Sequence, residues 1–97
     1  MNSEHSSLRN FLRGYLHQDW KQEHGSIDRV VRQFCGDAGP GEVRRVGTEW
    51  QEFMEWTKGL PLGEITRQLT QLGSAWQPAS VAELEALTRA LERCPPD

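Results

Sequence analysis

Polar and aromatic side chains that could do chemistry are concentrated near the N-terminus of this chain. The run Tyr15-Leu-His-Gln-Asp-Trp20 is followed closely by Glu23 and His24. Zinc and related metals are bound by imidazole and carboxylate groups that converge on one point, but the spacing of His17, Asp19 and His24 matches no strong ligand motif. We favour a hydrogen-bonded structural corner, with direct contact to a partner through Asp19 and Glu23 as the other interpretation. No metal or other cofactor is predicted.

A second candidate site lies further along the chain, where acidic residues flank a tryptophan. At about 100° per residue, Trp56 falls well away from the apolar helical stripe centred on Trp50, between Glu49 and Glu52. Trp56 either packs beneath another helix, with the glutamates solvated, or forms an exposed anchor for a basic partner. The predicted partner-binding residues are Glu49, Glu52, Trp56, Asp19 and Glu23.

Catalytic chemistry has no evident basis in the sequence. Hydrolysis by acid–base catalysis would need paired carboxylates, and covalent catalysis would need a nucleophile with a base beside it. Cys35 has no supporting motif, Ser6, Ser7 and Ser26 are typical helix caps, and there is no phosphate-binding loop. We therefore predict that the protein is not an enzyme.

Length and charge narrow the class of protein further. A chain of 97 residues predicts a single domain over 1–97, with residues 1–6 and 95–97 frayed. The net charge of −3, from 14 acidic and 11 basic residues, argues against nucleic-acid binding and is compatible with a basic partner.

The N-terminal residues and the cysteines bear on the compartment. There is no apolar leader and no run long enough to span a membrane, so we expect a cytoplasmic protein. Two cysteines, Cys35 and Cys94, are too few for a disulfide scaffold. In a reducing cytosol they are expected to be free thiols at helix ends.

Apolar residues recur with a helical period in the segments that must position these sites. Residues 16–25 are expected to be irregular and pinned to the core by Trp20, and residues 37–41 are expected to form a loop. The predicted helices cover about residues 7–15, 26–36, 42–58 (or from Thr48), 61–73 and 80–94.

Local signals at the helix ends support this division. Ser26 is placed as an N-cap, Gly36 as a left-handed C-cap, and Ser80 with Glu83 as a capping box, with Val81 facing inward. No segment shows the alternation of apolar and polar residues, with a period of two, that would predict a β-strand. The predicted fold class is all-α: a single small domain of four to five short helices packed as an irregular bundle.

The same landmarks carry a resemblance to a known family. Tyr15–Trp20, the helix start at Gly25-Ser26 and a tail with Leu60-Pro61, Leu72-Gly73, Trp76 and Ser80 resemble the immunity proteins of bacterial contact-dependent growth inhibition (CDI) systems. The resemblance implies a small helical protein that binds and neutralises the C-terminal toxin domain of an effector. We expect an acidic helical face to occlude the toxin's active site or to bind tightly beside it. That toxin is expected to be basic, and a nuclease would offer a phosphate site for an acidic face to fill. The alternative is a helical adaptor or regulatory subunit of another cytoplasmic protein.

Overall fold

A computed structural model describes residues 6–94, and all of the regular structure in that range is helical. The predicted all-α fold class is therefore confirmed. The predicted frayed ends, 1–6 and 95–97, lie outside the described residues apart from Ser6, which begins the first helix. The helices are α1 (Ser6–Tyr15), α2 (Trp20–His24), α3 (Ile27–Asp37), α4 (Pro40–Trp56), α5 (Leu62–Gln71) and α6 (Val81–Glu92).

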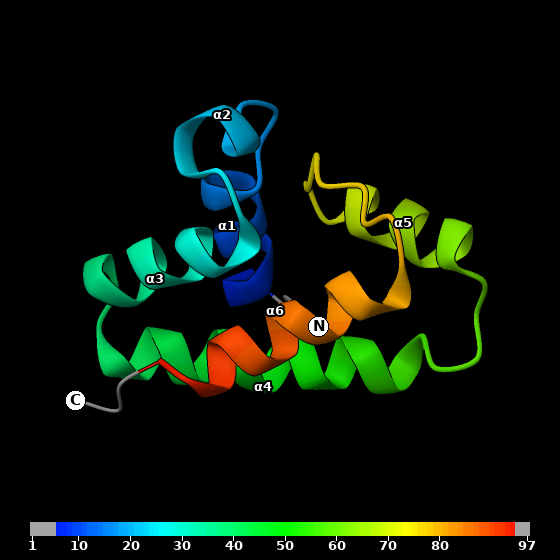
Figure 1. Ribbon diagram of the computed structural model, residues 1–97. Coiled ribbons are helices and arrows are strands. Elements are labelled where there is room, and N and C mark those ends of the chain that lie inside the picture. The colour runs from blue at the N-terminus through cyan, green and yellow to red at the C-terminus, as the bar shows by residue number, and fades with distance from the viewer. Residues whose placement is uncertain (1–5, 95–97) are drawn as a thin grey trace.

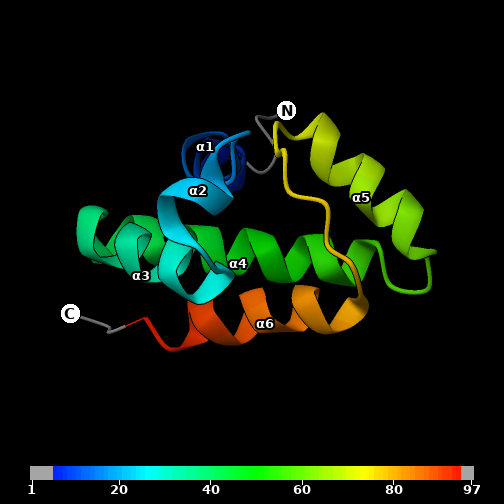
Figure 2. The same ribbon diagram turned by 45° about the horizontal axis from the view of Figure 1, so that its top comes forward.

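The longest helix, α4, forms the base on which the others are arranged (Figures 1 and 2). Helix α6 runs alongside α4, and α3 packs against α6 at one end of this pair. Helix α1 stands on α4 and also contacts α3, whereas the single turn α2 packs on α3. Helix α5 lies at the opposite end from α3, and an extended segment returns from it to α6.

Two tryptophans lie at the centre of the core. Trp50 and Trp76 are 1% and 2% exposed, with their ring centroids 6.5 Å apart. The indole N–H of Trp50 donates to the hydroxyl of Thr88 at 2.7 Å, which satisfies the buried donor and joins α4 to α6. The other fully buried large side chains are Phe11, Phe53, Leu8, Leu12, Leu16, Leu69, Leu84, Leu87, Val30 and Val31.

The turn between α3 and α4 is shorter than the sequence pattern predicted. Helix α3 continues through Gly36, which is not a left-handed cap, and ends in an extended Ala38. Helix α4 begins at Pro40. Proline suits the first helical position because its φ is already helical, and because an N–H at that position would have no acceptor within the helix. The predicted loop at 37–41 and the alternative start at Thr48 are both wrong, and α4 passes through Gly47 without a break.

Two other local predictions also need correction. The segment 16–25 is not wholly irregular, because Trp20 begins the short helix α2 and packs against the core. Val81 is 51% exposed, since it occupies the first position of α6 and the buried stripe starts only at Leu84. The Glu83 carboxylate accepts from the backbone N–H of Ala79, at 3.1 Å, and not from that of Ser80.

The predicted N-cap at Ser26 is confirmed. The Ser26 hydroxyl accepts from the backbone N–H of Arg29 at 3.3 Å, as an N-cap should. Gly59 and Gly73 follow α4 and α5 with φ of 89° and 107°, in the left-handed region that favours glycine.

The cysteines are paired, contrary to the prediction of free thiols. Cys35 in α3 and Cys94 just after α6 form a disulfide with their Cα atoms 5.8 Å apart. The prediction rested on the expected compartment alone, whereas the packing of α3 on α6 brings the two residues within bridging distance. None of the described helices combines the length and apolarity needed to cross a bilayer.

Candidate binding surfaces

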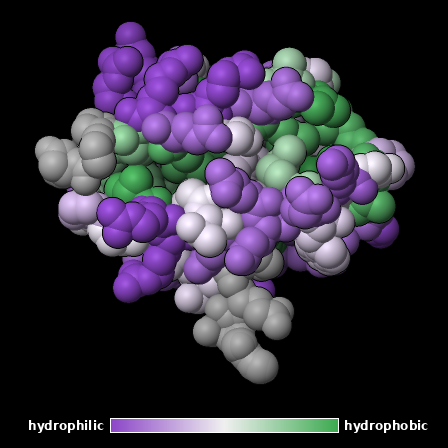
Figure 3. All heavy atoms as spheres, turned by 90° about the horizontal axis from the view of Figure 1, so that it is seen from below, coloured by the Kyte–Doolittle hydropathy of each residue, from purple (hydrophilic) through white to green (hydrophobic). Residues whose placement is uncertain are grey.

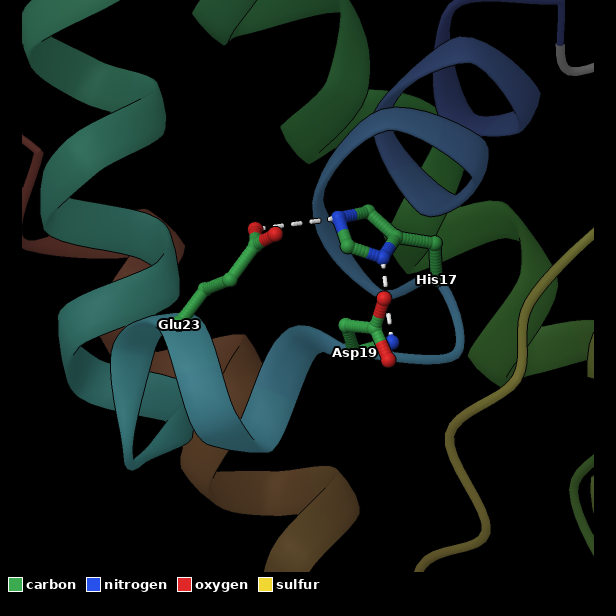
Figure 4. A group of neighbouring side chains, drawn as sticks. All are labelled: His17, Asp19 and Glu23. Carbon is green, nitrogen blue, oxygen red and sulfur yellow. Dashed lines mark hydrogen bonds and ion pairs between the residues drawn. The ribbon is translucent and has the colours of Figure 1, made fainter.

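The N-terminal group of polar residues forms a hydrogen-bonded corner between α1 and α2. His17 Nε2 lies 3.2 Å from a carboxylate oxygen of Glu23, and the backbone N–H of Asp19 donates to His17 Nδ1 at 3.1 Å (Figure 4). Because Nδ1 accepts, the neutral ring carries its proton on Nε2 and donates it to Glu23. The predicted hydrogen-bonded corner is confirmed, and His17 is joined in it to Glu23 and to the backbone of Asp19.

The same three side chains were considered as metal ligands. One potential ligand atom from each of His17, Asp19 and Glu23 lies within 4.8 Å of the others. However, the two ring nitrogens point in different directions, one toward Glu23 and the other toward Asp19 (Figure 4). A metal needs its ligand atoms to converge on one point, so this geometry fits a corner better than a metal centre.

Further hydrogen bonds hold the corner against the body of the protein. The carbonyl of Leu16, a fully buried residue, accepts from the backbone N–H of Ala75 at 2.8 Å. The hydroxyl of Tyr15 donates to the Asp37 carboxylate at 2.8 Å. Burial and this bond to Asp37 raise the pKa of Tyr15 to about 12. The exposed carboxylate of Asp19 is thus carried on a well-anchored segment.

On α4, Glu49 has a structural partner. Its carboxylate accepts from the backbone N–H of Leu8, in the first turn of α1, at 2.8 Å. The first N–H groups of a helix have no helical acceptor, and a negative charge beside them also interacts favourably with the helix dipole. Glu49 is accordingly half-buried and joins α4 to α1.

Trp56 is the most exposed large apolar residue among those described. It is 62% exposed, and its ring is in a T-shaped arrangement with that of Phe53, with the centroids 6.1 Å apart. The interpretation in which a neighbouring helix covers Trp56 is therefore wrong. Glu52 and Glu55 are both exposed and lie on the same side of Trp56 on the helical wheel, about 40° and about 100° away from it.

Leu60, four residues after Trp56, is a second exposed apolar residue and was not predicted as a site residue from the sequence. It is 39% exposed and follows the left-handed Gly59 that terminates the turn after α4. A residue beyond the end of a helix has no place in the helical period, so no periodic signal could have identified it. We refer to Glu52, Glu55, Trp56 and Leu60 as the α4 surface.

The predicted partner-binding residues do not all lie together. Asp19 and Glu23 belong to the corner beside α3, away from the C-terminal end of α4 (Figures 1 and 2). Seen from below, the molecule is mostly hydrophilic, with hydrophobic side chains visible between polar ones (Figure 3).

These features define a small helical protein that carries an exposed tryptophan and exposed carboxylates on its surface. A family model described as "CdiI immunity protein" matches residues 4–83. The chain belongs to this family and is an immunity protein of contact-dependent growth inhibition, for which the family implies a cognate toxin. The match spans α1 to α5 and the start of α6. No curated protein and no solved structure shows significant similarity to the chain.

Proposed function

We propose that this protein binds the C-terminal toxin domain of a contact-dependent growth inhibition effector in the bacterial cytoplasm and blocks the toxin's active site. Inhibition is stoichiometric and involves no catalysis by the immunity protein. The family membership supports the general role, and the exposure of Trp56 is the observation that supports a location for the contact.

The composition of the α4 surface is typical of a binding hot spot, which is the part of an interface that contributes most of the binding free energy. Tryptophan is enriched among residues whose truncation costs more than about 2 kcal/mol of binding free energy. Trp56 is 62% exposed, and Leu60, four residues further along the chain, adds exposed apolar area. The cost of leaving these side chains in water is removed when a partner covers them.

Charge supports a basic partner. Glu52 lies about one helical turn before Trp56 and Glu55 directly precedes it, and the whole chain carries a net charge of −3. Opposite potentials on two proteins accelerate their encounter and disfavour incorrect partners. A nuclease toxin would present a basic, phosphate-binding active site, in which these carboxylates take the place of phosphates.

The corner and Glu49 take different parts in this proposal. Asp19 and Glu23 form a secondary acidic contact, held in place by the hydrogen bonds around His17. Glu49 acts indirectly, because its carboxylate is engaged with α1. It positions the helix that carries Trp56.

Binding of variants to the cognate toxin domain, measured by calorimetry, tests the proposal. Trp56→Ala is expected to weaken binding by at least about 2 kcal/mol, or roughly thirtyfold, and Trp56→Phe by less. The exposed Arg29 in α3 offers a control, and Arg29→Ala should leave the affinity nearly unchanged.

The charge contribution is tested separately, leaving Glu49 intact. Glu52→Lys with Glu55→Lys should slow association and reduce its dependence on salt. Glu85→Lys with Glu92→Lys makes the same change in net charge on exposed positions of α6 and is the matched control. Absence of any complex with the toxin domain contradicts the proposed function, whereas tight binding by every folded α4 variant contradicts only the proposed surface.

A further inference from the structure

A disulfide forms part of the wall of a cavity between α3 and α6. The Cys35–Cys94 bridge lines a space of about 430 Å³, which two arginines, Arg32 and Arg93, also line. One carboxylate, Asp28, faces the same space, so the lining carries a net positive charge. Both cysteines are partly exposed. A small molecule that enters the cavity therefore meets the bridge directly.

We propose that this cavity is a thiol-exchange site for anionic low-molecular-weight thiols. The entering thiolate attacks one sulfur of the bridge, the S–S bond breaks, and its electron pair leaves on the other cysteine as a thiolate. The product is a mixed disulfide. A second thiolate attacks that mixed disulfide, which releases the oxidised small thiol and leaves Cys35 and Cys94 reduced. The two small thiols supply the two electrons.

The arginines account for the preferred charge of the thiol. A guanidinium remains protonated at any pH of interest, so Arg32 and Arg93 attract a thiol that also bears carboxylates. The same positive potential stabilises the thiolate that leaves during exchange. The remaining lining is formed by small or apolar residues such as Val31, Gly36 and Ala90. The volume lies within the usual range for small-molecule sites.

Exchange has a structural consequence for the end of α6. Cys94 lies beyond residues 4–83, which the family model matches, and the bridge ties this end of the chain to Cys35 within the matched region. Reduction removes the covalent link between α3 and the end of the chain that follows α6. This proposal does not depend on how the toxin is bound.

Reduction of the oxidised full-length chain by three thiols tests the proposal. Glutathione is anionic, 2-mercaptoethanol is neutral and cysteamine is cationic. Each second-order rate is divided by the rate of the same thiol on a small neutral disulfide, which removes differences in thiol reactivity. Glutathione is expected to exceed cysteamine by about tenfold at low salt. This ratio should fall toward one as salt is added, and mass spectrometry should detect a glutathione adduct on Cys35 or Cys94.

Paired variants identify the source of the preference. Arg32→Gln with Arg93→Gln should abolish the preference for glutathione. Arg44→Gln in α4 with Lys58→Gln in the turn after α4 makes the same change in net charge and should retain the preference. The proposal is overturned by equal normalised rates for the three thiols, or by a preference that persists in the Arg32 and Arg93 variant. Two free thiols after treatment with excess oxidised glutathione would also overturn it. The salt dependence of the unmodified chain tests the same electrostatic point without any substitution.

Discussion

Individual residues in this protein have roles that depend on partners distant in sequence. Glu49 is adjacent to Trp56 on a helical wheel, yet its carboxylate is used at the N-terminus of α1, 41 residues away in sequence. Tyr15 likewise joins the end of α1 to Asp37 at the end of α3. Such contacts fix the angles between helices, and through them the orientation of the exposed groups.

The Tyr15–Asp37 hydrogen bond predicts a loss of stability at alkaline pH. The pKa of Tyr15 is about 12 in the folded chain, against 10.0 for the unperturbed group, mainly because of burial. The folded state therefore retains its proton between these values while the unfolded state loses it. The stabilisation is complete below pH 10 and declines as the pH rises toward 12.

Tyr15 is the only tyrosine in the chain, so tyrosinate absorbance reports this group alone. We expect the titration midpoint near the raised pKa, and Asp37→Asn should move it downward, because both the hydrogen bond to Asp37 and its negative charge raise the pKa. A midpoint at the unperturbed value in the folded protein would contradict the contact.

At the scale of helices, glycines set where α4 and α5 end. Gly73 has φ of 107°, and a Cβ there would collide with the side chain of Arg13. Gly73→Ala is expected to lower the free energy of unfolding by about 1–3 kcal/mol, through backbone strain and displacement of Arg13. Chemical denaturation measures this change.

Gly47 provides the matched control for that substitution. It lies inside α4, and a Cβ added there meets nothing within 4 Å. Gly47→Ala should therefore raise the free energy of unfolding by up to about 1 kcal/mol, because alanine is the better helix former. Equal effects of the two substitutions would show that the left-handed conformation of Gly73 is not a constraint.

Helix positions were predictable from sequence because their signals are local. Ser26 caps α3, Gly73 follows α5, and apolar spacing identified the buried face of α4. The turn at Ala38-Gly39 is shorter than predicted. Glycine and proline are typical of loops, but proline is also favoured at the first position of a helix, so their presence did not locate the start of α4. The candidate site was only partly predictable. The spacing between Trp50 and Trp56 shows that Trp56 lies off the buried face of α4, but its exposure also depends on how the other helices pack, which the spacing does not give.

For the molecule as a whole, long-range links decide how the helices hold together. The Cys35–Cys94 disulfide spans a sequence separation of 59 residues between α3 and α6. Neither cysteine has a sequence motif that signals pairing, so only the tertiary packing reveals the bridge. The same packing leaves the α4 surface open, at the C-terminal end of α4.

Loss of the bridge should lower global stability. By the chain-entropy model, a closed loop of this length stabilises the folded state by up to about 4 kcal/mol. Cys94→Ser under oxidising conditions is expected to lower the free energy of unfolding by about 2–4 kcal/mol, as followed by denaturation. A reductant should have the same effect on the unmodified chain and none on the variant. No change in either experiment would contradict a stabilising bridge.

The central proposal is that Trp56 lies inside the complex with the toxin domain. Side-chain oxidation footprinting, read by mass spectrometry, compares Trp56 in the free chain and in the saturated complex. We predict rapid oxidation of Trp56 in the free chain and strong protection in the complex, while the buried Trp50 is protected in both states. Oxidation of Trp56 at the same rate in the saturated complex would contradict the account.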